Sequence, residues 1–104
     1  MHDGIIQIRA NRELSENEIR SILNIVERYR GKSEYEIIES ENGFDIYFTR
    51  VNDARHTASK IIKVLDGNLK TSAKFLRVSS GRAIYRFTFR VKLPDVPSRA
   101  RYGF

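Results

Sequence analysis

The sequence predicts a single α+β domain, in which two helices pack on one face of a mostly antiparallel β-sheet. Apolar residues recur with the spacing of a helix in residues 19–29 and again in residues 54–65. Residues 85–93 instead alternate between apolar and cationic or polar side chains, which is typical of a half-buried strand. With 104 residues, 40% of them hydrophobic and 31% charged, the chain can form one modest core.

The first predicted strand covers residues 4–10, with apolar side chains on one side and polar ones on the other. A helix follows, because Ser15 and Glu18 have the spacing of a capping box. We expect this helix to run to about Arg30 and to end at Gly31, which can take the left-handed conformation that helix ends favour. Its predicted buried face carries Ile19, Ile22, Leu23, Val26 and Tyr29.

Residues 35–40 and 44–49 predict the second and third strands, joined by a turn of the Asn-Gly kind at Asn42-Gly43. A second helix comes next. Asn52 or Asp53 can cap its start, and Gly67 is expected to close it. Its predicted apolar stripe consists of Ala54, Ala58, Ile61, Ile62 and Leu65.

Residues 69–78 predict a fourth strand, and a turn at residues 79–81 leads into the last strand. The resulting order, β-α-β-β-α-β-β with both helices on one face, is similar to ferredoxin-like folds. We expect one domain over residues 1–94 and a basic, flexible tail over residues 95–104. On the last strand, period two sends Tyr85, Phe87, Phe89, Val91 and Leu93 to the core, and Arg86, Thr88, Arg90 and Lys92 to solvent.

The charge of the chain is distributed unevenly. The formal net charge is +6, yet residues 1–45 hold six basic and ten acidic residues, whereas residues 46–104 hold thirteen basic and three acidic ones. Clustered positive charge attracts polyanions and speeds their capture. A surface of solvated cations is the simpler interpretation, and it remains open at this point.

Few residues suggest catalysis or a bound metal. The two histidines, His2 and His56, have no second ligand at metal-binding spacing, and the chain has no cysteine. No glycine-rich phosphate loop occurs. We therefore expect no cofactor, no metal and no enzymatic activity. The sequence also has no apolar run long enough to span a bilayer and no signal peptide, so we expect a cytoplasmic protein.

Nucleic-acid binding fits the charge pattern better, because the open face of the sheet would carry cations together with an exposed aromatic residue, Tyr47. The alternative is an edge that lysine and arginine protect from aggregation. We expect the acidic half to face solvent or a basic protein through Glu16, Glu18, Glu34, Glu36, Glu39 and Glu41. The candidate phosphate contacts are Arg9, Arg86, Arg90 and Lys92, followed by Arg50, Arg55, Lys70, Lys74, Arg77 and Arg82.

An ordered set of segments carries a family resemblance. They are residues 6–9 (IQIR), 43–48 (GFDIYF), 52–55 (NDAR), 70–72 (KTS) and 85–93 (YRFTFRVKL), and together they extend over most of residues 4–95. The set resembles the family of the nuclear-export adaptor of the large ribosomal subunit, which includes archaeal relatives named after nonsense-mediated decay. The zinc-binding CxxC pairs expected ahead of this region are absent, so the chain is either an excised domain or a stand-alone relative.

The resemblance implies a non-enzymatic factor that docks on the large ribosomal subunit during late assembly. Its expected partners are rRNA and possible neighbouring ribosomal proteins, and we expect it to act as a monomer. Two other functions stay open: a protein–protein module of a longer polypeptide, or a generic RNA-binding ferredoxin-like domain. A small hydrolase is a third possibility, which would need a concave pocket with convergent polar groups.

Overall fold

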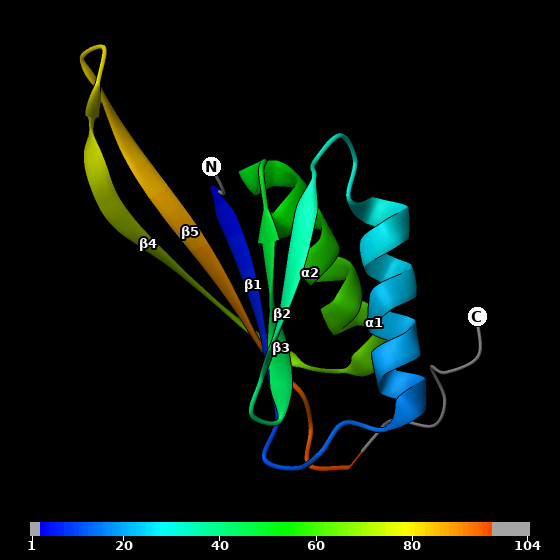
Figure 1. The fold of residues 1–104 in the computed structure, drawn as a ribbon. Helices are drawn as coiled ribbons and strands as arrows, with labels where there is room; N and C mark the ends of the chain where they lie inside the picture. The colour runs from blue at the N-terminus through cyan, green and yellow to red at the C-terminus, as the bar shows by residue number, and fades with distance from the viewer. Residues whose placement is uncertain (1–2, 97–104) are drawn as a thin grey trace.

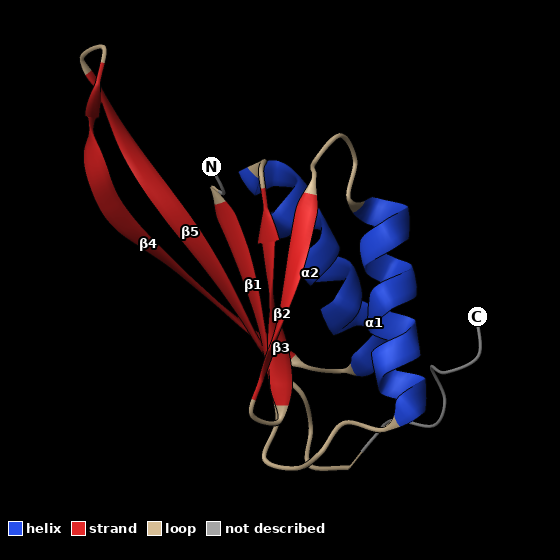
Figure 2. Cartoon of the chain, viewed as in Figure 1, coloured by secondary structure: helices blue, strands red, loops and turns tan. Residues whose placement is uncertain are grey.

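The computed structural model describes residues 3–96. Residues 1–2 and residues 97–104, which are most of the tail predicted over residues 95–104, lie outside the described residues. Five strands form one sheet, and two helices cover one of its faces (Figures 1 and 2). The predicted α+β class and element order are confirmed. The elements are β1 (Gly4–Arg9), α1 (Glu16–Tyr29), β2 (Tyr35–Ser40), β3 (Gly43–Phe48), α2 (Val51–Leu65), β4 (Asn68–Ser79) and β5 (Arg82–Lys92).

The strands lie in the order β2-β3-β1-β5-β4. Three of the four pairings are antiparallel, and only β1 and β5 run parallel. The arrangement is ferredoxin-like, with β4 added as an outer edge strand beside β5. β5 therefore lies in the middle of the sheet over part of its length, between β1 and β4.

The core lies between the sheet and the two helices. Period two sends every second side chain of β1, β3 and β5 toward the helices. These side chains pack against the apolar stripe of α2, whose predicted members Ala54, Ala58, Ile61 and Leu65 are all buried. The strand residues buried beneath the helices are Ile6, Ile8, Phe44, Ile46, Phe48, Phe89 and Val91.

Helix α1 begins with the predicted capping box: Ser15 Oγ accepts from the Glu18 N–H at 3.1 Å, and Glu18 Oε1 accepts from the Ser15 N–H at 2.8 Å. Gly31 follows the helix with φ of 61°, as predicted. The predicted buried face was partly wrong, because Ile19 and Leu23 are exposed and Ile25 is buried instead. The stripe is rotated along the helix, so that Ile22, Ile25 and Val26 face the core.

Helix α2 starts and ends differently from the prediction. It begins at Val51, and the preceding Arg50 makes no side-chain capping bond. Asp53 caps nothing; its Oδ2 accepts from Ser33 Oγ at 2.8 Å and ties the α1–β2 loop to the helix. At the other end the left-handed residue is Asp66, with φ of 58°, and not Gly67.

The β4–β5 hairpin projects beyond the rest of the sheet (Figure 1). β1 pairs with β5 only from Phe87 to Lys92, whereas β4 pairs with β5 as far as Ser79 and Arg82. The outer parts of the two strands, residues 74–79 and 82–86, we call the arm. The prediction that Tyr85 packs in the core was wrong, because Tyr85 lies on the arm and is 44% exposed.

Candidate nucleic-acid interface

The strand register gathers the cations of the β4–β5 hairpin on one face. Directly opposed residues of an antiparallel pair share a face, and alternate residues along a strand return to it. Lys70 is opposite Arg90, and Lys74 is opposite Arg86. A register shift between Phe75 and Arg77 brings Arg77 onto the same face, opposite Ile84. The resulting surface, which we call the cationic face, consists of Lys70, Lys74, Arg77, Arg82, Arg86, Arg90 and Lys92.

The cationic face has no acidic residue of its own, because residues 67–94 contain neither Asp nor Glu. Like charges placed directly opposite each other destabilise a sheet. Lys70 and Arg90 nevertheless face each other, and neither has a hydrogen-bond or ion-pair partner within residues 3–96. The hairpin thus carries a local electrostatic cost that a bound polyanion would relieve.

A hollow of about 730 Å³ opens at the base of this face, where β1 and β5 end and β4 begins. Arg9, Lys70, Arg90 and Lys92 line it with positive charge, and Asn11 and Asn68 add amide groups. Lys92 Nζ donates to Asn11 Oδ1 at 3.0 Å. Lysine and arginine nitrogens together with amide N–H groups are suitable donors for phosphate oxygens.

Arg9 differs from the other cations of this region. Its Nη1 lies 2.7 Å from Asp45 Oδ1 on the neighbouring strand β3, and both side chains are about one-fifth exposed. Asp45 is opposite Gln7 in the β1–β3 register, two positions along β1 from Arg9 and therefore on the same face. Asp45 therefore marks the boundary where the positive surface ends and the β2–β3 side of the sheet begins.

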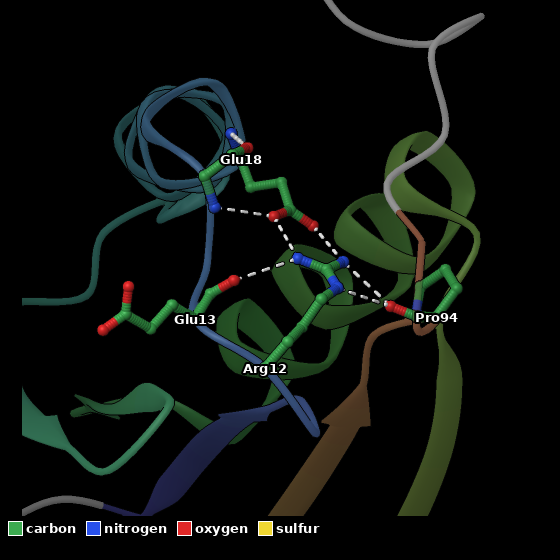
Figure 3. A network of polar contacts seen from close by, with 5 residues as sticks. Arg12, Glu13, Glu18 and Pro94 are labelled. Atoms are coloured by element: carbon green, nitrogen blue, oxygen red, sulfur yellow. Dashed lines mark hydrogen bonds and ion pairs between the residues drawn. The ribbon is translucent and has the colours of Figure 1, made fainter.

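A polar network centred on Arg12 lies next to the ends of β1 and β5 (Figure 3). Arg12 donates from Nη1 and Nη2 to the two carboxylate oxygens of Glu18, each at 2.7 Å. The same guanidinium donates to the Pro94 carbonyl at 2.8 and 3.1 Å. The segment after β1, the start of α1 and the segment after β5 are thereby joined. Asn11 and Lys92, which line the hollow, are close in sequence to residues of this network.

The polar network of Figure 3 keeps the Glu18 carboxyl ionised. Burial by itself would raise the pKa of the Glu18 carboxyl, since only 1% of the residue is exposed. Hydrogen bonds from Arg12 and from the Ser15 backbone, with the positive charge of Arg12, outweigh burial and lower the pKa below its ordinary value. The expectation that Glu18 faces solvent or a basic partner was wrong, because it is a buried, ionised partner of Arg12.

Two predicted phosphate contacts lie away from the cationic face. Arg50 precedes α2. Arg55, on α2, places its guanidinium 5.8 Å from the Phe87 ring centre and 5.6 Å from that of Phe89. Since Phe87 and Phe89 point to the helix side of the sheet, Arg55 is separated from Arg86 and Arg90 by the sheet itself. The sequence could not distinguish these two arginines from the strand cations, because a count of charges does not show which way a side chain points.

The family model described as NMD3, second domain, matches residues 1–93. The chain belongs to the NMD3 family. The match extends from the first strand to the end of the last strand, so the whole NMD3 fold described above falls inside it. No curated protein matches the chain. The resemblance drawn from the ordered segments is confirmed, and NMD3 is a ribosome-associated adaptor family that is not known as enzymatic.

Three residues of the candidate interface were not predicted from the sequence: Asn11, Asn68 and Asp45. The asparagines border strands, where they were indistinguishable from ordinary turn residues, and Asp45 became relevant only through the register of β1 and β3. Thr49, directly after β3, accepts from the Glu34 N–H through its Oγ1 at 3.1 Å. Within residues 3–96, no group of three or more His, Cys, Asp or Glu side chains could hold a metal, and no helix is long and apolar enough to cross a membrane.

Proposed function

We propose that this NMD3 domain binds rRNA of the large ribosomal subunit during subunit assembly, with the cationic face against the phosphate backbone. One observation carries the proposal: seven lysine and arginine side chains share one face of a hairpin that has no acidic residue. Membership of a ribosome-associated family supplies the nature of the partner. The expected mode of action is binding without catalysis.

The hollow gives the proposed contact a centre. A phosphate placed there is within the reach of cations from three strands, β1, β4 and β5, and of the Asn11 and Asn68 amides. The opposed pair Lys70 and Arg90 borders it, and neutralising that pair recovers the energy that their repulsion costs. Arg55, on the helix side of the sheet, and Arg50, at the start of α2, are left out of the proposed contact.

Sedimentation tests the proposed function. The purified domain is centrifuged with large and with small ribosomal subunits at two salt concentrations. The proposal predicts co-sedimentation with the large subunit that weakens at the higher salt concentration, because each phosphate contact changes the logarithm of the binding constant by about 0.7–0.9 per logarithmic unit of salt. Equal binding to both subunits, or binding to neither, contradicts it.

A protein contact is the second candidate, and one observation favours it. Ile37 and Ile38 are exposed on β2, the edge strand at the other end of the sheet from the cationic face. An exposed edge strand with apolar side chains can pair with an extended segment of another protein. Subunit binding that is insensitive to salt and is lost on Ile38→Lys would support this candidate.

A further inference from the structure

The arm has an aromatic surface on the face opposite its cations. Phe75 and Tyr85 are directly opposed in the register, and their rings meet edge to face with 5.8 Å between ring centres. Phe75 is 52% exposed and Tyr85 44%, although both lie on the face that is buried farther down the hairpin. Val78, also on this face, is 64% exposed.

Within residues 3–96, no segment covers this surface. The helices reach only the inner part of the hairpin, where Phe89 and Val91 are buried, and the arm extends past them (Figure 1). An isolated two-stranded hairpin is only marginally stable in water. Burying the exposed aromatic rings of such a hairpin against a partner would therefore contribute more free energy than their contacts within the domain do.

The charge of the arm decides the class of partner. One face carries Lys74, Arg77, Arg82 and Arg86, and the other carries the aromatic pair, so the partner must offer negative charge and flat apolar surfaces within the width of two strands. Unpaired RNA has both, in its phosphates and its splayed bases. Paired A-form RNA offers phosphates alone here, because its deep, narrow groove excludes side chains from the bases.

We propose that the arm inserts among unpaired nucleotides of RNA, with Phe75 and Tyr85 stacking on bases while the cationic face contacts the neighbouring phosphates. The inference rests on the proposed function and deepens it, since it adds recognition of single-stranded RNA to a charge-based contact. Stacking accepts any base, so the arm selects unpaired segments and not a sequence.

The test uses single-stranded RNA oligonucleotides and a duplex RNA of the same length, with Phe75→Ala, Phe75→Leu and Tyr85→Phe variants. The expected result for Phe75→Ala is a loss of about 5- to 100-fold in affinity for the single strand. The salt slope should stay unchanged, because no charge is removed. Phe75→Leu should lose nearly as much, since it keeps the apolar volume but not the ring, whereas Tyr85→Phe keeps the ring and the affinity.

A second variant gives a direct signal of stacking. The chain has no tryptophan, so Phe75→Trp introduces a single tryptophan, which can be excited selectively and whose emission should be quenched by single-stranded RNA and much less by the duplex. Thermal unfolding of each variant checks that the fold is retained.

The inference is overturned if Phe75→Ala binds single-stranded RNA as tightly as wild type does. If Lys70→Gln/Arg90→Gln nevertheless weakens RNA binding, the proposed function survives. If Lys70→Gln/Arg90→Gln also leaves RNA affinity unchanged, the inference and the proposed function both fail. Full affinity of Phe75→Leu for single-stranded RNA would show that the Phe75 ring does not stack on a base, and self-association abolished by Phe75→Ala with RNA affinity intact would indicate a second copy of the chain. Either result contradicts the proposal.

Discussion

Lys70 and Arg90 face each other across the β4–β5 pair, with no acidic side chain between them and no partner for either within residues 3–96. Protein folding gains nothing from this arrangement, since opposed like charges weaken a sheet. Their placement at the rim of the hollow gives the pair a use in binding. Stability and affinity should therefore respond in opposite directions when this pair is changed.

Lys70→Glu tests that opposition. The new carboxylate would face Arg90 and replace repulsion by attraction, so the free energy of unfolding should rise by about 0.2–1 kcal/mol. Affinity for large-subunit rRNA should fall at the same time. Chemical denaturation and a binding titration measure the two effects. Lys32→Glu, an equal charge change on the exposed α1–β2 loop, is the control and should alter neither quantity comparably.

Asp45→Asn should act in the reverse sense on binding. It removes the carboxylate that neutralises Arg9, so the affinity for rRNA should increase several-fold at low salt. Glu41→Gln makes the same change in net charge at the exposed β2–β3 turn and serves as the comparison. If both variants gain affinity equally, net charge alone is responsible and the role assigned to Arg9 is incorrect.

Glu18→Ala should be the most destabilising of these substitutions. It removes one half of the capping box and leaves the partly buried Arg12 without its carboxylate, which together should cost about 2–4 kcal/mol. Glu16→Ala, in the same turn but exposed, should cost less than about 1 kcal/mol. A denaturation midpoint for Glu18→Ala close to that of Glu16→Ala would show that the network in Figure 3 contributes little.

The stability of the domain should decline in acid. The pKa of Glu18 is lower in the folded state than in the unfolded state, so its contribution to stability is complete above the ordinary pKa of an unfolded glutamate and is lost as pH falls through the folded pKa. Unfolding curves at pH 7, 4 and 3 should show this loss in the wild type. The decline should be shallower in Glu18→Gln, and parallel declines in the two proteins would rule out Glu18 as a source.

The sequence predicted the helices and strands well where short-range interactions determine them. The Ser15–Glu18 capping box, the Gly31 helix end and the alternation from Phe87 to Lys92 are all short-range patterns, and each is present in the fold. Helix ends that depend on tertiary contacts were missed. Asp53 could not be recognised as a partner of Ser33, because the two residues are twenty positions apart.

The candidate site was predicted in its residue types but not in its geometry. Alternation alone assigned Arg86, Arg90 and Lys92 to one face. It could not reveal that β5 runs past β1, and so it placed Tyr85 in a core that does not extend that far. The irregular register near Phe75, which puts Arg77 with the other cations, leaves no signal in the sequence.

The salt dependence of binding to large-subunit rRNA tests the central claim most directly. Wild type is compared with Lys70→Gln/Arg90→Gln and with Arg20→Gln/Arg28→Gln, which removes the same charge from α1 on the opposite side of the sheet. If the cationic face holds the RNA backbone, the first double variant should reduce the magnitude of the salt slope by about 1.4–1.8, and the second should leave it near the wild-type value. Identical slopes for all three proteins would contradict the account.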